Sequence, residues 1–341
     1  MAMKKTAKPK KERNRMAILA ALRRHNGPLS SSELAARLRE TGLDLSERTL
    51  RLYLSELDAE GLTEARGRRG RVITAKGMAE GHAAATLERV GYFSARIDRM
   101  IYRMSFDLPT RSGEVVVNTS LISPERLLAA TDEICRVMEL GYAMGNRLAL
   151  LGPGEKLNDL TVPPGNVGLC TVCSITLNGV LLKHGVPTAS RFGGLLELRN
   201  HKPERFVEMI NYGGTSVDPL ETFIRAGMTD YRGAIRDGDG LIGASFRELP
   251  EDGRSLVIHL AAELEMAGLG ALMLIGQPSQ PLLGVPVSEG RIGAVMVGGL
   301  NPVAILEESG IRVHSRAMAG LLEFDRLFHY DELARRLRAL M

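Results

Sequence analysis

Residues 168–191 read GLCTVCSITLNGVLLKHGVPTASR, and residues 293–316 read GAVMVGGLNPVAILEESGIRVHSR. Both stretches run from an apolar strand through a short turn into a helix, and both end in a second extended segment. When the first stretch is shifted by 125 residues, three glycine or arginine positions coincide: Gly168 with Gly293, Gly185 with Gly310, and Arg191 with Arg316. This spacing predicts that the main part of the chain is an internal duplication.

The sequence before each of these stretches also repeats, although less closely. ELGYAMGNRLALLGPG around Gly141 resembles EMAGLGALMLIGQP around Gly268, and the strand-like segments GEVVVNTSL and LIGASFREL precede them. We therefore expect two copies of a β–α–β–β–α–β unit, at about 110–235 and 236–341, in an α/β (α+β) domain with sheets of mixed direction. A ligand cleft is expected between the copies, which should pack about a pseudo-twofold axis.

The beginning of the chain predicts a different domain, at 1–85, in which three helical segments precede a short hairpin. The second helix opens with a capping box, Ser30-x-x-Glu33. The third is capped by Ser46 and carries an apolar stripe of Leu50, Leu54 and Leu57. The segment LTEARGRRGRVIT then predicts two short strands around a basic tip. Three helices followed by such a hairpin are typical of a winged helix-turn-helix, whose third helix enters the major groove of DNA.

An alanine-rich segment at 75–95 is expected to close this first domain and to connect it with a second one at 95–341. Charge divides the chain in the same way. Residues 1–80 hold 18 Lys and Arg against 10 Asp and Glu, whereas the remainder holds 26 against 30. A basic first domain on a mildly acidic second one predicts that double-stranded DNA binds at one end only.

The predicted DNA-binding residues lie on the third helix and on the wing. An arginine reads guanine bidentately in the major groove, and arginines on a wing and lysines on a tail neutralise phosphates. In the alternative interpretation, the domain binds another protein and its arginines are only solvated. The candidates are Arg48, Thr49, Arg51 and Ser55 on the helix, and Arg66, Arg68, Arg69 and Arg71 on the wing.

Several long motifs of the second domain resemble one known family. They are VCSITLNGVLLKHGVP, RFGGLLEL, PERFVEMINYGGTSVDPLETFI, ASFRELP and VMVGGLNPVAILEESGI, in this order. They are similar to the effector domain of the archaeal nitrogen-regulation repressors called NrpR, and the first domain resembles the ribonuclease R-type winged helix that the family carries. The resemblance implies a transcription factor that represses nitrogen-assimilation operons and is released by 2-oxoglutarate. Some relatives carry two effector domains in tandem, whereas these motifs occur once here.

A dicarboxylate effector needs cations or clustered N–H donors at both of its ends. The repeated helix starts supply N–H donors, a second glycine-rich loop follows at YGGTS, and three arginines are candidate carboxylate partners. Alternatively, these stretches only cap helices, as Asn301 is predicted to do, and their glycines only allow close packing. The candidate effector residues are Ser174, Thr176, Asn178, Arg191, Thr215, Ser216, Arg247, Gly299, Asn301 and Arg316.

The sequence gives little support to catalysis, to a metal or to a cofactor. Its seven histidines are scattered, and its three cysteines, an odd number, do not form a disulfide framework. No apolar run is long enough for a membrane span and no secretory signal is evident, so a cytoplasmic protein is expected. A single winged helix contacts few base pairs, so we expect a homodimer on a pseudo-palindromic operator. Two alternatives remain: an RNA-associated winged-helix module and a small-molecule enzyme.

Overall fold

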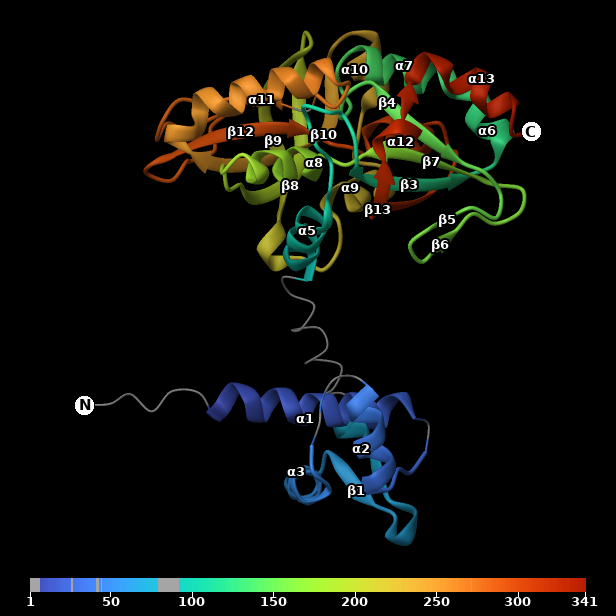
Figure 1. Ribbon diagram of the computed structural model, residues 1–341, viewed down its shortest axis with the longest axis vertical. Coiled ribbons are helices and arrows are strands. Elements are labelled where there is room, and N and C mark those ends of the chain that lie inside the picture. The colour runs from blue at the N-terminus through green and yellow to red at the C-terminus, as the bar shows by residue number, and fades with distance from the viewer. Residues whose placement is uncertain (1–6, 26, 41–42, 44, 79–91, 271) are drawn as a thin grey trace. The chain divides into compact units, whose positions relative to one another are not determined.

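In the computed structural model (Figure 1), the chain divides into two compact units, Met1–Val90 and Gly91–Met341. The structure describes residues 7–25, 27–40, 43, 45–78, 92–270 and 272–341. The first residues of the basic tail and most of the predicted connector at 75–95 therefore lie outside the described residues.

The first unit is a winged helix, as the sequence predicts. Its leucines meet in one small core, which includes the predicted stripe of Leu50, Leu54 and Leu57. Its elements are α1 (Ala7–Arg24), α2 (Ser31–Glu40), α3 (Glu47–Ala59), β1 (Thr63–Ala65) and β2 (Arg71–Ile73).

Both predicted helix caps of this unit are present. The backbone N–H of Ser30 donates to Glu33 Oε2 at 2.9 Å, and the N–H of Glu33 donates back to Ser30 Oγ at 3.3 Å. Ser46 Oγ accepts the N–H of Thr49 at 3.2 Å. The wing is fixed at its base because Leu29 and Arg71 exchange two backbone hydrogen bonds, of 3.0 and 2.9 Å. These local contacts explain why α3 and the wing could be predicted from sequence.

The second unit contains two five-stranded sheets and a small hairpin. The first sheet has the order β13 (His314–Glu323), β3 (Glu114–Ile122), β7 (Val167–Val172), β4 (Arg147–Leu151), β14 (Phe328–His329). The second has the order β11 (Leu272–Ile275), β12 (Arg291–Val297), β10 (Gly240–Pro250), β8 (Ala189–Arg199), β9 (Lys202–Asn211). The hairpin consists of β5 (Lys156–Leu157) and β6 (Leu160–Thr161).

The two copies exchange their last strands. The first copy contributes β3, β4 and β7 to the first sheet, but its next strand, β8, pairs with β10 of the second copy. In the same way, β13 of the second copy leaves its own sheet and pairs with β3. Each copy thus completes the sheet of the other, and four strands of the two sheets have the same order, β13-β3-β7-β4 and β8-β10-β12-β11. The fifth strands differ, because β14 pairs with β4 and β9 pairs with β8.

Every pairing between the described strands is antiparallel, so the expectation of sheets of mixed direction was wrong. A parallel pair needs a helical crossover that returns the chain to a neighbouring position in the same sheet. Here β7 lies between β3 and β4, and the helix after β7 leads to the other sheet. The exchange of strands therefore removes the adjacent parallel pairs that the β–α–β pattern suggested.

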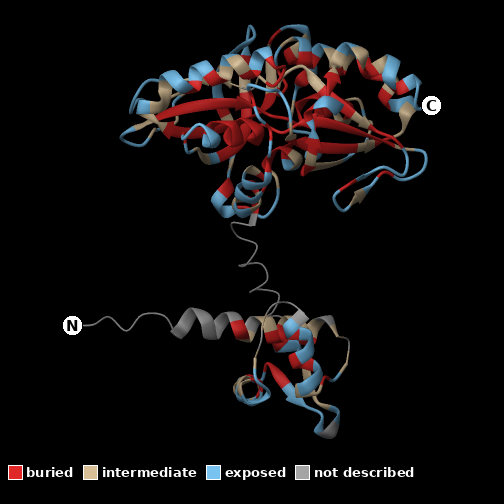
Figure 2. Ribbon diagram, in the orientation of Figure 1, coloured by how far each residue is buried: buried red, intermediate tan, exposed pale blue. Residues whose placement is uncertain are grey.

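The helices of the second unit cover the sheets and connect the copies. Helix α8 of the first copy packs against α11 of the second, and α12 of the second packs against α7 of the first. In Figure 2 the strands of both sheets are largely buried, whereas the helices have exposed outer faces. No helix among the described residues is both long and apolar enough to span a membrane. The helices are α5 (Tyr92–Arg103), α6 (Pro124–Ala129), α7 (Thr131–Glu139), α8 (Ile175–Lys183), α9 (Pro219–Arg225), α10 (Tyr231–Arg236), α11 (Arg254–Met266), α12 (Asn301–Glu308) and α13 (Leu333–Arg338).

Candidate functional site

The outer face of α3 carries most of the predicted base-reading residues. Arg48, Arg51 and Ser55 are exposed on the side of the helix opposite to its leucine stripe. Arg51 pairs with Glu47 one turn earlier, at 2.9 Å, with both side chains largely in solvent. Thr49 is half-buried because its hydroxyl shares a hydrogen bond of 2.8 Å with Ser46 at the helix start. The helix therefore presents two solvent-exposed guanidinium groups, of which that of Arg51 is paired with Glu47. Thr49 takes part in the N-cap of the helix.

The wing arginines differ from one another in their surroundings. Arg69 is exposed, and Arg66 pairs with Glu64 on the wing itself at 3.0 Å. Arg71, at the base, donates from Nε to Asp58 Oδ2 of α3 at 2.8 Å and is only about a quarter exposed. This contact ties the wing to α3, which gives Arg71 a structural role in addition to its predicted one. The side chain of Arg68 lies outside the described residues.

The second candidate site is a small cavity where the repeated helix starts meet. Gly299, just before α12, packs so closely on the turn before α8 that an added Cβ would lie 2.3 Å from the Val172 carbonyl oxygen. Beside this contact lies a cavity of about 30 Å³. Strands of both sheets, both helix starts, the start of α9 and helix α5 contribute to its lining, which includes Asn118, Ser174, Tyr212, Asp218, Arg247 and Gly299.

Arg247 of β10 is the main polar group of this cavity and is 1% exposed. Its Nη1 donates to the Ser174 carbonyl at 3.1 Å and to Asn178 Oδ1. Its Nη2 donates to Ser174 Oγ at 2.8 Å, whereas its buried Nε has no hydrogen-bond partner among the described residues. No carboxylate pairs with this guanidinium in the described part of the chain, and burial lowers its pKa to about 10.

A buried cation surrounded only by neutral acceptors is costly, and an anion in the cavity would offset that cost. The first copy of the duplication supplies the neutral acceptors, Ser174 and Asn178, and the second copy supplies the cation. All three residues are candidates from the sequence, and the structure brings them together with Gly299. The arrangement is suited to binding a small anion.

Asp218 lines the same cavity and was not among the sequence candidates. Its Oδ1 accepts the Glu221 N–H at 2.9 Å, which caps α9. Part of the residue reaches solvent, but the carboxyl group is surrounded by protein, and this burial raises its pKa to about 7. Burial also raises the pKa of Tyr212, another lining residue. Asp218-Pro219 gave only a helix-start signal in the sequence.

Other sequence candidates have structural partners inside the fold. Thr176 is fully buried, and its hydroxyl bonds the backbone of Val116 at 3.2 Å. Thr215 Oγ1 accepts the Val217 N–H at 3.1 Å within its own loop. Ser216 is exposed. None of these three residues lines the cavity at Arg247.

The predicted capping role of Asn301 was wrong. Leu300 occupies the N-cap position of α12, and no side-chain hydrogen bond caps this helix. Asn301 is fully buried, and its Nδ2 donates to the carbonyls of Tyr142 and Gly243, both at 2.8 Å. The close packing between the copies places these carbonyls beside the side chain, so Asn301 joins the two halves instead of capping the helix.

The repeated arginines lie outside the cavity. Arg191 Nη1 pairs with Glu248 at 2.8 Å and Arg316 Nη2 with Asp159 at 3.8 Å. Both arginine side chains are nearly half exposed, at 47% and 43%. Each arginine falls at an irregularity in its ladder, in β8 and in β13, so the duplication preserves a β-bulge at this position.

The described residues contain no group of three or more histidine, cysteine or acidic side chains that would hold a metal ion. Cys170 and Cys173 are buried free thiols, and burial raises the pKa of each to about 11. A thiol with a raised pKa is a poor nucleophile at neutral pH. These cysteines therefore act as apolar core residues.

Comparison with known proteins identifies both units. Residues 90–329 match the family described as NrpR regulatory domains NRD1 and 2, and residues 16–80 match the ribonuclease R winged-helix domain. A crystal structure of a nitrogen repressor-like protein from Methanococcus jannaschii matches with a TM-score of 0.59 and 27% identity, over 70% of this chain and 98% of that one.

Curated relatives extend the match over both units. The chain is 32% identical over 316 residues to the global nitrogen regulator NrpRI of Methanosarcina mazei, which covers 93% of this chain and 97% of that protein. It is 30% identical over 293 residues to the global nitrogen regulator NrpR of Methanococcus maripaludis, of which it spans about half the length, 51%. This chain therefore belongs to the NrpR family, whose members are transcriptional repressors rather than enzymes.

Proposed function

We propose that this protein is a cytoplasmic repressor of nitrogen-assimilation genes that binds a pseudo-palindromic DNA operator as a homodimer. An anionic metabolite, with 2-oxoglutarate as the first candidate, binds at Arg247 and weakens the binding of DNA. The names of the relatives support nitrogen regulation. The choice of 2-oxoglutarate rests on the resemblance to the family and on the chemistry of the cavity.

The face of the winged helix supports DNA binding. Arg48 and Arg51 are exposed on α3, where they would contact bases in the major groove. Arg69 is exposed on the wing, where it would contact phosphates. The second unit is expected to dimerise, because two winged helices read twice as many base pairs as one.

The observation that carries the effector proposal is the buried Arg247 guanidinium, which has hydrogen-bond partners but no ion pair with a carboxylate among the described residues. A carboxylate of the metabolite would supply that charge through charge-assisted hydrogen bonds. The helix starts of α8 and α12 lie beside it, and their N-terminal dipoles also favour negative charge. Asp218 would repel an anion when ionised, so its raised pKa supports anion binding at and below neutral pH.

The test measures operator binding by the full-length protein with and without 2-oxoglutarate, using DNA selected from a random pool. Arg247→Met keeps the volume of the side chain but removes its charge. We expect this variant to bind the operator normally and to lose at least about 30-fold in affinity for 2-oxoglutarate, since removal of a buried hydrogen-bonded charge costs about 2–5 kcal/mol. Calorimetry gives the metabolite affinity, and thermal melting checks that the variant folds.

Ser120→Ala is the matched control, because Ser120 occupies the ladder position in the first sheet that Arg247 occupies in the second. It should leave both affinities unchanged. If Arg247→Met folds and binds 2-oxoglutarate as tightly as the parent, the effector site lies elsewhere. If the protein selects RNA and shows no preference for any DNA duplex, the proposal of an operator is wrong.

A further inference from the structure

The cavity at Arg247 is too small for the metabolite in the conformation seen here. Its volume of about 30 Å³ is enough for one or two water molecules. A five-carbon dicarboxylate is several times larger, so part of the wall must move before such a molecule can enter. The position of the movable wall determines how binding reaches the rest of the protein.

Most of the wall belongs to the frame of the second unit. Asn118 and Arg247 lie on central strands, and Ser174 and Gly299 lie in the tightly packed turns between the copies. Displacing these residues would break sheet ladders or separate the two halves. Phe93 and Ile97 of α5 line another side, next to Tyr212 and Asp218 of the segment that leads into α9, and α5 stands outside both sheets (Figure 1).

Helix α5 begins directly after the residues that lead from the winged helix. Its side chains Phe93, Ile97 and Met100 are buried in the core of the second unit, and two specific contacts tie it to the cavity wall. The Phe93 ring stacks on Tyr212 with centroids 5.4 Å apart. Arg96 Nη2 donates to the carbonyls of Ala317 and Met318, at 2.8 and 2.9 Å.

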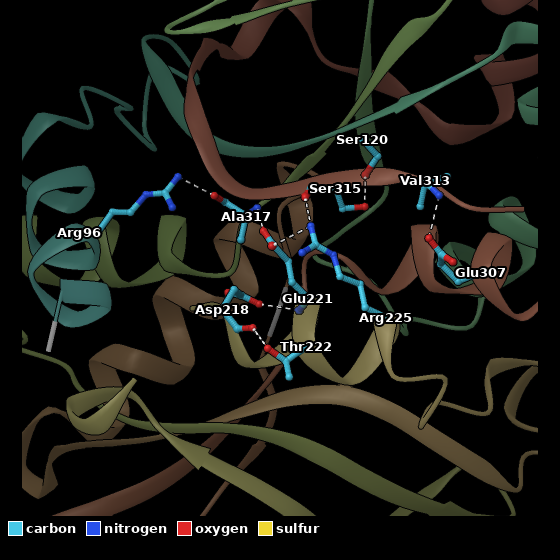
Figure 3. A network of polar contacts seen from close by, with 10 residues as sticks. All are labelled: Arg96, Ser120, Asp218, Glu221, Thr222, Arg225, Glu307, Val313, Ser315 and Ala317. Atoms are coloured by element: carbon cyan, nitrogen blue, oxygen red, sulfur yellow. Dashed lines mark hydrogen bonds and ion pairs between the residues drawn. The ribbon is translucent and has the colours of Figure 1, made fainter. Parts of the chain in front are cut away.

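The carbonyls that hold Arg96 come from the bulge in β13. Residues 317–319 fall between the paired positions Arg316 and Gly320, and Met318 has a φ of 48°, which is uncommon for a residue other than glycine. Figure 3 shows that Ala317 bonds Arg96 through its carbonyl and Glu221 through its N–H, and that Asp218 accepts the Glu221 N–H. Asp218, in the cavity wall, is thus connected to Arg96 through one short polar chain.

We infer that α5 is the gate of the effector cavity, held closed by Arg96, and that its displacement on effector binding acts on the winged helix through the connecting residues. This inference rests on the proposed effector site at Arg247. When Phe93 and Ile97 move outward, the cavity enlarges and the Arg96 hydrogen bonds break. Because α5 both closes the site and directly follows the connecting residues, its displacement by the bound effector would alter the affinity of the winged helix for DNA.

Two measurements on the full-length protein test the gate. The first is hydrogen exchange of residues 92–103 in the parent, with and without 2-oxoglutarate. We expect the metabolite to speed exchange in α5 while it slows exchange around Ser174. If exchange in α5 stays the same or slows when the metabolite binds, the inference is overturned.

The second measurement uses Arg96→Ala, with Arg99→Ala as its control. Arg99 is an exposed arginine of the same helix and does not line the cavity. Without the Arg96 hydrogen bonds the closed state is weakened, so 2-oxoglutarate should bind at least about 5-fold more tightly, and operator affinity without metabolite should fall by a similar factor. Arg99→Ala should change neither affinity. Equal behaviour of the two variants would overturn the gate.

Failure of the effector proposal gives a different result. If the parent gives no calorimetric signal with 2-oxoglutarate, the proposed effector is wrong. The gate is then judged from operator affinity alone. An Arg96→Ala variant that folds and binds the operator like Arg99→Ala would reject it, and one that binds at least about 5-fold more weakly would retain it.

Discussion

The two sheets of the second unit share the order of four strands but differ in the chemistry of equivalent positions. Ser190 of β8 pairs with Arg247 of β10, and the equivalent Ser315 of β13 pairs with Ser120 of β3. In the first pair the ladder carries a buried cation beside a cavity, whereas in the second the two serine hydroxyls bond each other at 2.8 Å. Duplication thus preserved the backbone, and only one of the two equivalent positions acquired a charged group.

The helix starts differ in the same way. At the start of α8, Ser174 and Asn178 accept hydrogen bonds from Arg247. The equivalent positions at the start of α12 are Gly299 and Val303, which have no such side-chain acceptor. Val303 is 1% exposed in the core. The proposed function together with this comparison predicts one anion site in each chain, formed by the first helix start, with the second helix start acting as its packed wall.

The largest effect is expected where the second helix start meets the first. Gly299→Ala would place a Cβ 2.3 Å from the Val172 carbonyl oxygen and 3.0 Å from Cys173 Cα. Because backbone must shift to relieve this contact, we expect a loss of about 3 kcal/mol in the free energy of unfolding, at the upper end for overpacked sites. Denaturant or thermal unfolding measures this change.

Two substitutions serve as comparisons for Gly299→Ala. Gly214→Ala introduces the same methyl group where nothing lies within 4 Å, so it should change stability little. Ser174→Gly removes one hydrogen bond to Arg247 at the equivalent helix start, at a cost of about 1 kcal/mol. If Gly299→Ala is as stable as Gly214→Ala, the two helix starts are not packed as tightly as described.

Sequence patterns predicted the features that depend on neighbouring residues. The Ser30 and Ser46 caps, the leucine stripe of α3 and the strand–helix order of each copy follow from local spacing. The exchange of β8 and β13 between sheets could not be predicted in this way, because a strand has the same alternation whichever sheet it joins.

The site was predictable only in part for the same reason. Arg247, Ser174 and Asn178 were candidates from the sequence, but whether a carboxylate pairs with Arg247 depends on residues far away in sequence. In the sequence, Asp218 is recognisable only as a helix cap and Phe93 only as an apolar helix residue, so neither could be assigned to the cavity. Asn301 is of a residue type that is common at N-caps, but its buried side chain instead donates hydrogen bonds to carbonyls of both halves.

An intermediate effect is expected from the buried carboxyl group in the cavity wall. Asp218 has a pKa raised to about 7 by burial, against an ordinary value of 3.8. The folded protein therefore holds a proton that the unfolded chain releases, so this group makes stability fall as pH rises from about 4 to 7. Asp218→Asn should remove that fall and be about 1–3 kcal/mol more stable than the parent at pH 8, with little difference at pH 4.

The measurement is thermal unfolding of both proteins across this pH range. Asp237→Asn is the control, because Asp237 is an exposed aspartate beside Arg236, which lowers its pKa. It should show no gain at pH 8. Parallel stability curves for the parent and Asp218→Asn would mean that Asp218 is already ionised at acidic pH and does not limit anion binding.

The smallest effects are expected at the arginines that the duplication repeats, since both lie outside the cavity. Glu248, the partner of Arg191, is buried and keeps hydrogen bonds from Ser288, whereas Asp159, the partner of Arg316, is 89% exposed. Arg191→Ala should therefore cost up to about 1 kcal/mol and Arg316→Ala less than about 0.5 kcal/mol, as exposed ion pairs contribute little. Calorimetry should give the same 2-oxoglutarate affinity for both variants as for the parent. A ten-fold weaker affinity in either folded variant would mean that the metabolite binds at the bulged strands and not at Arg247. Because the two halves are alike at these bulges, two sites per chain would then be expected.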